Sequence, residues 1–387
     1  MNYLLAKKAK KVDEMKTEIL AEKADPSEVP PVIIVHGAGS TKIGFGGEMF
    51  PRFVFPRQST ILSDRIKRFP LQGSYTTNEE WLKAYWQAMV MKLGVDLSER
   101  RVLLSLPTAN LLDCPFRDLA QEFFYEDLQT NQIAVVSDPF LSLVSFVPQT
   151  KSLTGIIVDI GFSQIRIVPI YNSIIMENKI TQVSFGGFDL TKTMGLWLQN
   201  KGFEGSIDAL FLRDIKENFC YVRPFKHTIS EKDNESFTYS IDKYNFQLDS
   251  ELWKLTELFF FKDYFSKKIE TCPRSNIDGE RFPMNEINLS KAIGFIAKSI
   301  DSKIAPKLLE NICLTGGGTK FNGLHERLLG ELQFHFPEYK SEIKIYSHKN
   351  SDLASYEGAS KLSTLPSFSK YWRNCEDFDE GLYDFFL

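Results

Sequence analysis

The chain has 387 residues, and 43% of them are hydrophobic, which is enough to bury a large core and to form two domains around a cleft. Its 46 basic and 50 acidic side chains give a formal net charge of -4. This balance lacks the excess of Lys and Arg that DNA or an anionic lipid surface attracts, so we expect neither nucleic acid nor a membrane as a direct partner. The five cysteines are scattered with no CxxC pair, and no stretch approaches the roughly 20 apolar residues of a membrane span, so we expect an unsecreted intracellular protein.

Residues 1–31 differ in composition from the rest of the chain, because Lys, Glu and Ala dominate them and prolines close them. We treat them as an N-terminal extension, since proline stops a helix. Four of its apolar residues lie near heptad spacing: Leu5, Val12, Met15 and Ile19. This spacing fits an amphipathic helix that docks on a partner, and it also fits a solvated charged helix.

From Val32 onward, short apolar runs alternate with amphipathic helical patterns, which is typical of α/β proteins. Six runs are predicted strands: residues 32–35, 102–106, 133–136, 156–159, 165–170 and 312–314. Apolar residues three or four positions apart predict helices over 82–93, 289–300 and 324–332, whose apolar faces we assign to the core. The aromatic run 259–261 also reads as core, whereas the acidic and aromatic tail 376–387 fits either a peptide ligand for a partner or a terminus folded on its own surface.

Two distant segments share one pattern of strand, glycine turn and strand. Residues 33–37 followed by 42–45 have the same form as residues 157–161 followed by 165–168. Two such hairpins predict two halves of similar topology that aim their turns at a shared ligand across a cleft. Backbone N–H groups in turns of this kind can hold phosphate oxygens. A third glycine element, at 315–319, follows a predicted strand and lets the backbone approach a bulky ligand.

Five motifs, in the same order along the chain, resemble those of the actin family. The opening segment of the family resembles residues 42–47 with 51–52 and 55–56. The second phosphate hairpin resembles residues 155–171, and the helix start that follows it resembles residues 186–191. The adenosine-contacting helix resembles residues 214–217 with 220–222, and the adenine-side glycine loop resembles residues 311–323. The resemblance runs from about residue 32 to the end of the chain. It implies an actin fold, in which two similar α/β domains surround a central nucleotide cleft.

The resemblance also implies domain boundaries and ligands. We expect the extension 1–31, a domain I of residues 32–150 plus 352–387 with subdomain 2 shortened near 57–76, and a domain II of residues 151–351. The cleft should hold ATP or ADP, with Mg, or be empty. The residues that match the family's nucleotide contacts are Gly37, Ala38, Gly39, Lys42, Asp159, Gly161, Arg166, Lys216, Glu217, Gly316, Gly317 and Gly318, and Asp159 is also the candidate metal ligand.

Several positions depart from the family's catalytic pattern. Val35 stands where the first hairpin should carry its Asp, while Asp159 persists in the second. Asp138 stands at the position of the glutamine, and Arg166 at that of the histidine, which together position the attacking water. Bulkier or different residues also fill the second turn, namely Ile160, Phe162 and Ser163. Metal-assisted phosphoryl transfer needs charge neutralisation and an oriented water, so we assign no catalytic residue and expect hydrolysis to be very slow or absent.

Binding without hydrolysis is a separate question. Arg166 could replace the missing cation by contacting phosphate directly, whereas Asp352 stands where the family usually has a basic residue beside the base. The alternative is that the glycines and Lys42 only preserve turns and cleft packing. In either case we expect Gly317 to adopt a left-handed turn that excludes a branched side chain.

A second departure concerns assembly. Only residues 57–76 lie where polymerising actins build a small subdomain with a mobile loop that grips the next subunit. Without that loop, the chain could bind another actin-like protomer, or a subunit of a large complex, through one end only, and it should form no homopolymer. This short region, together with residues 98–102, resembles the dynactin pointed-end actin-related protein.

The expected function is therefore that of a non-polymerising structural or capping subunit of a cytoskeletal complex, microtubule-motor or axonemal, with a degenerate ATPase site. We expect it in the cytoplasm with the cytoskeleton, or in a cilium. Two alternatives stay open. A nucleotide-dependent ATPase switch would use Lys42, Asp159, Lys216, Glu217 and the triple glycine, and a nuclear subunit of a chromatin-remodelling complex would share the fold.

Overall fold

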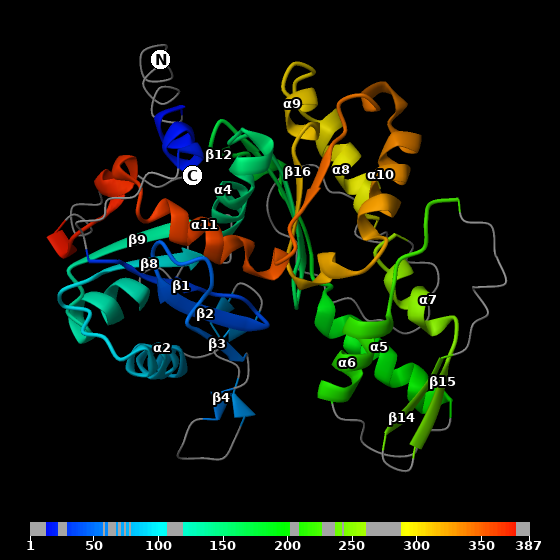
Figure 1. Cartoon of the computed structure of the whole chain (residues 1–387), viewed down its shortest axis with the longest axis horizontal. Coiled ribbons are helices and arrows are strands. Elements are labelled where there is room, and N and C mark those ends of the chain that lie inside the picture. The colour runs from blue at the N-terminus through cyan, green and yellow to red at the C-terminus, as the bar shows by residue number, and fades with distance from the viewer. Residues whose placement is uncertain are drawn as a thin grey trace.

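The computed structural model of the chain describes residues 13–21, 29–56, 59–60, 67–68, 71–72, 75–76, 79–106, 119–201, 209–226, 237–241, 244–260 and 288–376. Figure 1 shows two lobes side by side, each built around a twisted sheet with helices against it. In the described ranges, no helix is long and apolar enough to cross a membrane.

The first lobe contains a five-stranded mixed sheet in the order β3-β2-β1-β8-β9. Its strands are β1 (Val32–Val35), β2 (Ser40–Phe45), β3 (Phe53–Pro56), β8 (Arg101–Leu106) and β9 (Gln132–Ser137). β1 pairs antiparallel with β2, and on its other side it pairs parallel with β8, which in turn pairs parallel with β9. All four side chains of β1 are buried, as expected for a strand covered on both faces.

The second lobe repeats this arrangement. Its main strands are β10 (Gly155–Ile160), β11 (Ile165–Tyr171), β12 (Ile174–Ile175), β16 (Ile312–Thr315) and β17 (Ile345–Ser347), in the order β12-β11-β10-β16-β17, with β13 (Thr181–Val183) paired to β11. β10 pairs antiparallel with β11 and parallel with β16. The two predicted hairpins are therefore equivalent, each at the centre of its own sheet.

The helices cover these sheets and connect them. They are residues 13–20, α2 (Glu79–Leu93), α4 (Asp138–Thr150), α5 (Gly187–Asn200), α6 (Ala209–Phe219), α7 (Glu251–Glu257), α8 (Leu289–Lys298), α9 (Ala305–Leu309), α10 (Leu324–His335) and α11 (Ala354–Leu362). Among the described residues, three short strand pairs lie outside the two sheets, namely β4 (Ser59–Thr60) with β5 (Lys67–Arg68), β6 (Leu71–Gln72) with β7 (Tyr75–Thr76), and β14 (Phe237–Ile241) with β15 (Tyr244–Leu248). The six predicted strands and three predicted helices are confirmed, within one to three residues at their ends.

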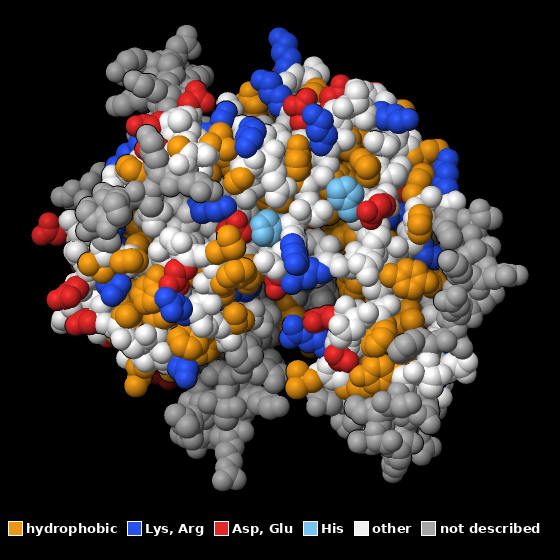
Figure 2. All heavy atoms as spheres, viewed as in Figure 1, with side chains coloured by type: hydrophobic (Ala, Val, Ile, Leu, Met, Phe, Trp, Pro, Cys, Tyr) orange, Lys and Arg blue, Asp and Glu red, His pale blue; other side chains and the backbone are white. Residues whose placement is uncertain are grey.

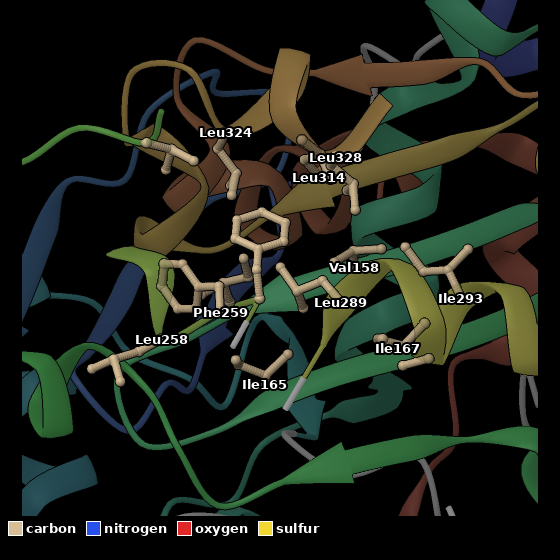
Figure 3. Close-up of a cluster of buried hydrophobic side chains, with 14 of the residues drawn as sticks. Val158, Ile165, Ile167, Leu258, Phe259, Leu289, Ile293, Leu314, Leu324 and Leu328 are labelled. Carbon is tan, nitrogen blue, oxygen red and sulfur yellow. The ribbon is translucent and has the colours of Figure 1, made fainter. Parts of the chain in front are cut away.

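Three clusters of buried apolar side chains hold the lobes together. One fills the second lobe between its sheet and α8 and α10, and Figure 3 shows its centre, with Phe259 packed among side chains of β10, β11 and β16. Phe259 and Phe260 belong to it, which confirms the core interpretation for this part of the aromatic run; residue 261 lies outside the described residues. A second cluster lies in the first lobe around Trp86. The third joins α4 and α11 to strands of both sheets, so the two lobes share one core along these helices.

The helix of residues 13–20 packs on the body of the chain itself. Met15 and Ile19, one turn apart, are 2% and 4% exposed and belong to the cluster shared by the two lobes. Glu18 Oε2 accepts a hydrogen bond of 3.0 Å from the backbone N–H of Ser367. Residues 13–20, the part of the predicted amphipathic helix that the structure describes, are helical, and their apolar residues Met15 and Ile19 are covered by the chain itself.

Other predictions fall on residues that the structure leaves undescribed. The shortened subdomain 2 is represented only by the short strands between 59 and 76, so the reduction stays a prediction. The tail beyond Glu376 and the heptad residues Leu5 and Val12 also lie outside the described ranges. The predicted domain boundaries, at 150/151 and 351/352, are not tested by the arrangement of the elements.

Candidate functional site

A cavity of about 500 Å³ lies between the two lobes and is lined by both hairpin turns, the glycine loop after β16 and α6. Figure 2 shows the surface hollowed between the lobes, with basic and acidic side chains at its edge. The predicted contacts come together here, since all of them line the cavity: Gly37, Ala38, Gly39, Lys42, Asp159, Gly161, Arg166, Lys216, Glu217, Gly316, Gly317 and Gly318. The volume falls in the range of small-molecule sites.

The two hairpins place corresponding residues at the cavity. In the first, Val35 of β1 pairs with Lys42 of β2. In the second, Asp159 of β10 pairs with Arg166 of β11. Each hairpin therefore carries a basic residue opposite the position that lies two residues before its turn glycine, Gly37 or Gly161, and the two basic residues face one cavity.

Arg166 is buried and is held by two carboxylates. Its Nε and Nη2 donate to Asp159 Oδ2 at 3.0 and 2.5 Å, and Nη2 also donates to Asp138 Oδ2 at 2.8 Å. Burial disfavours the charged guanidinium, but the charges of Asp159 and Asp138 outweigh this effect and raise the pKa of Arg166. Because Asp138 begins α4 and Asp159 lies in β10, this ion-pair cluster joins the second hairpin to the helix that links the two sheets.

The residues of the cavity do not fit a magnesium ion bound in the family's manner. The first-hairpin position holds the apolar Val35, and both carboxylates that remain, Asp138 and Asp159, are paired with Arg166. Magnesium prefers several oxygen ligands in an octahedral arrangement. Over the described ranges, no group of three or more His, Cys, Asp or Glu side chains could hold a metal ion. Asp159 as a metal ligand stays a prediction that this geometry opposes.

Lys42 provides a second positive charge, and within the described ranges no carboxylate lies at ion-pair distance from its ammonium. Its Nζ lies beside the first turn, 3.8 Å from where a Cβ on Gly37 would stand. Burial lowers the pKa of Lys42, although Asp138, Asp352 and Asp159 act in the opposite direction. The same added Cβ on Gly37 would lie 2.9 Å from the Ser40 carbonyl oxygen, so this turn requires glycine. A bare turn with an adjacent ammonium suits a phosphate group.

The glycine loop is constrained at its first position and not at its second. Gly316 has φ 86° and ψ 157°, a conformation that is essentially restricted to glycine. A Cβ there would lie 2.5 Å from Asp159 Oδ1, and one on Gly318 would lie 2.3 Å from Ile160 Cγ2. Around Gly317 an added Cβ would meet no atom within 4 Å, and its φ is not positive. The expectation of a left-handed turn at Gly317 was therefore wrong, and the constraint lies at Gly316.

On the α6 side, the predicted residues make contacts within the protein. Lys216 is 5% exposed, and its Nζ donates to the Gly187 carbonyl oxygen and to Thr191 Oγ1, both at 2.9 Å. Burial lowers the pKa of Lys216. Glu217 accepts a 2.7 Å hydrogen bond from Arg213. Lys216 thus ties α6 to the start of α5 and forms the wall of the cavity on this side.

Two further contacts at the cavity were not predicted. Asp352 pairs with Lys320 at 2.5 Å, so a lysine from the glycine loop supplies positive charge beside the acidic residue. Phe162 lies against Gly39, where an added Cβ would stand 3.0 Å from Phe162 Cβ, and its ring packs 5.6 Å from that of Phe188. The two hairpin turns therefore touch through Phe162.

His36 is the third unpredicted residue. It lies between Val35 and Gly37 at the cavity, and its Nε2 accepts a 2.6 Å hydrogen bond from the indole N–H of Trp86. Its backbone N–H donates to Ser105 Oγ at 2.9 Å, and Nδ1 lies 3.3 Å from the Ser105 carbonyl oxygen. Because the indole can only donate, Nε2 is unprotonated and Nδ1 carries the proton. Burial lowers the pKa of His36 from 6.5 to about 4, so the imidazole is neutral at physiological pH.

Comparison with models of protein families identifies this chain's relatives. The family described as Actin matches residues 26–207 and 203–384. Together these two matches cover well over half of the 387 residues, and they include both sheets and every residue of the cavity.

Proposed function

The chain belongs to the actin family, and we propose that it serves as a structural, non-hydrolysing subunit of a larger assembly. The observation that carries this proposal is the position of Arg166, whose guanidinium is bound by both Asp138 and Asp159. In the family, the corresponding positions hold groups that act on a cation and on the attacking water. Here these groups are paired with each other.

The chemistry of phosphoryl transfer explains why this arrangement opposes hydrolysis. The reaction depends on positive charge at the transferred group and on an oriented water molecule. Val35 offers no polar atom for either task, and a carboxylate paired with Arg166 is poorly placed to accept a proton from water. With these groups altered together, most of the catalytic rate should be absent.

The role in assembly rests on the sequence. Because only residues 57–76 stand in for the small subdomain of polymerising actins, we propose that the chain contacts an actin-like protomer, or another subunit of a cytoskeletal complex, through one face. A complex of the microtubule-motor or axonemal kind would suit a subunit with one such contact face. A chain with one such face caps an assembly and cannot extend it.

Purification of the native protein tests this role. We expect it to elute from size-exclusion chromatography together with stable partner subunits, and its elution as a free monomer without partners would contradict the proposal. Electron microscopy of the isolated chain with ATP and a divalent cation should show no ordered filaments. Ordered homopolymers would overturn the one-face geometry.

A further inference from the structure

The two hairpins present two cations at equivalent positions. Lys42 stands opposite Val35, and Arg166 stands opposite Asp159. The apolar residue in the first hairpin leaves Lys42 without a carboxylate across the ladder, whereas Arg166 faces one directly. Lys42 is thus available to a ligand in the cavity, whereas Arg166 is paired with the carboxylates of the cavity wall.

We propose that Arg166 takes the place of a divalent cation, so that the cavity binds a nucleoside diphosphate or triphosphate without magnesium. This inference deepens the proposed function and rests on it for the identity of the cleft. Lys42 is the group that contacts the phosphates, and Arg166 reduces the repulsion that Asp138 and Asp159 would otherwise exert on them.

The charges of Lys42, Arg166, Asp138 and Asp159 support these separate roles for the two basic residues. Two carboxylates near a polyphosphate would repel it, because like charges in a partly buried site interact strongly. Arg166 and Lys42 carry two positive charges, which balance Asp138 and Asp159. Guanidinium is effectively always protonated in proteins, so this neutralisation does not depend on a dissociable ion.

The packing fixes the guanidinium in place. The Arg166 side chain is 6% exposed, and those of Asp138 and Asp159 are 12% and 15% exposed. Gly316 lies over Asp159 so closely that an added Cβ would stand 2.5 Å from Oδ1, which leaves little room for an ion with its water shell on that side. Arg166 occupies Oδ2 of both carboxylates, so a magnesium ion would have to displace Arg166 before it could bind either of these two oxygens.

Calorimetric titration of the full chain with ADP and with ATP, in excess EDTA and in excess MgCl2, tests the inference. A metal that does not bind together with the nucleotide adds no affinity, and excess MgCl2 also withdraws free nucleotide as its magnesium complex, so the Kd in EDTA should be no weaker than the Kd in MgCl2. A loss of affinity of roughly tenfold or more in EDTA would overturn the inference, because it would reveal a coupled metal. Absence of binding in both buffers would overturn it as well.

A variant distinguishes this role from simple packing. Arg166→Met frees both carboxylates, so we expect nucleotide binding to weaken in EDTA and to recover when MgCl2 is added. Equal weakening in both buffers would contradict the inference. Arg52→Met, at an exposed arginine paired with Glu48 outside the cavity, is the matched control and should behave as the native chain.

A second variant covers the case in which Arg166→Met does not fold. Replacing all three members of the ion-pair cluster, Asp138→Asn, Asp159→Asn and Arg166→Met, leaves none of them as an unpaired buried charge and should preserve the fold. Magnesium should not strengthen its nucleotide binding, and a magnesium requirement would contradict the inference. Phosphate release by the native chain would contradict the proposed function alone, whereas magnesium-dependent binding without release would contradict only this inference.

Discussion

At the scale of single residues, the cavity is shaped by side chains whose hydrogen bonds are internal. Arg166, Lys216 and His36 all line it, and each is fixed by partners in other elements. Buried polar groups of this kind are costly when a partner is lost, because the remaining group cannot be solvated. The polar walls of the cleft therefore hold their geometry in the absence of a ligand.

His36 makes stability depend on pH. Its pKa is about 4 in the folded chain and 6.5 when exposed, so the unfolded state binds a proton more readily and stability falls as pH drops below 6.5. We expect acidification from about pH 7.5 to about pH 5 to cost the native chain about 2 kcal/mol more than it costs His36→Gln. Urea unfolding of both proteins at the two pH values measures this difference, and equal losses would contradict the assignment.

The glycine loop gives a prediction with an internal control. Gly316→Ala should destabilise the fold by at least about 2 kcal/mol, because its backbone conformation is nearly exclusive to glycine and the new Cβ would meet Asp159. Gly317→Ala should change stability by less than about 0.5 kcal/mol, since the added atom meets nothing. Thermal or chemical unfolding of both variants measures these two changes in stability. Similar effects at the two positions would be incompatible with the loop described here.

At the scale of elements, the apolar strands could be predicted and the polar contacts between them could not. β1 and β10 read as strands because they are short apolar runs before glycine turns, and the internal repeat indicated that they are equivalent. Asp138, one of the two partners of Arg166, lies 28 residues from it, and Trp86 lies 50 residues from His36, so these contacts form only when α4 and α2 pack on the sheets. Likewise, no sequence pattern distinguishes Gly316 from Gly317, because the backbone angle of each depends on the strand and turn on either side.

The helix of residues 13–20 supplies a prediction at this scale. It is held by Met15, Ile19 and one hydrogen bond from Ser367, so replacing both apolar residues with Ala should release it. Hydrogen exchange should then show loss of amide protection over 13–20 while the strands of both sheets stay protected. Leu20→Ala, at a residue 37% exposed on the same helix, should leave the protection unchanged. Persistent protection in the double variant would show that other contacts hold the helix.

At the scale of the whole molecule, two similar lobes meet at α4 and α11 and at the cluster around Arg166. The apolar part of this junction is the core that both sheets share. Its polar part is the triad of Arg166, Asp138 and Asp159, which lines the cavity between the lobes. The fold of the family is thus retained, while the groups expected to support turnover are engaged with each other. This pairing is the observation on which the proposed structural role rests.

Steady-state phosphate release from ATP and magnesium, by the native chain and by Asp159→Ala, tests this account most directly. Both proteins should release phosphate at the background rate, because a site without a carboxylate at Val35 and with Asp159 paired to Arg166 has no turnover to lose. Release by the native chain well above background, falling by about a hundredfold or more in Asp159→Ala, would show a working ATPase and contradict the account.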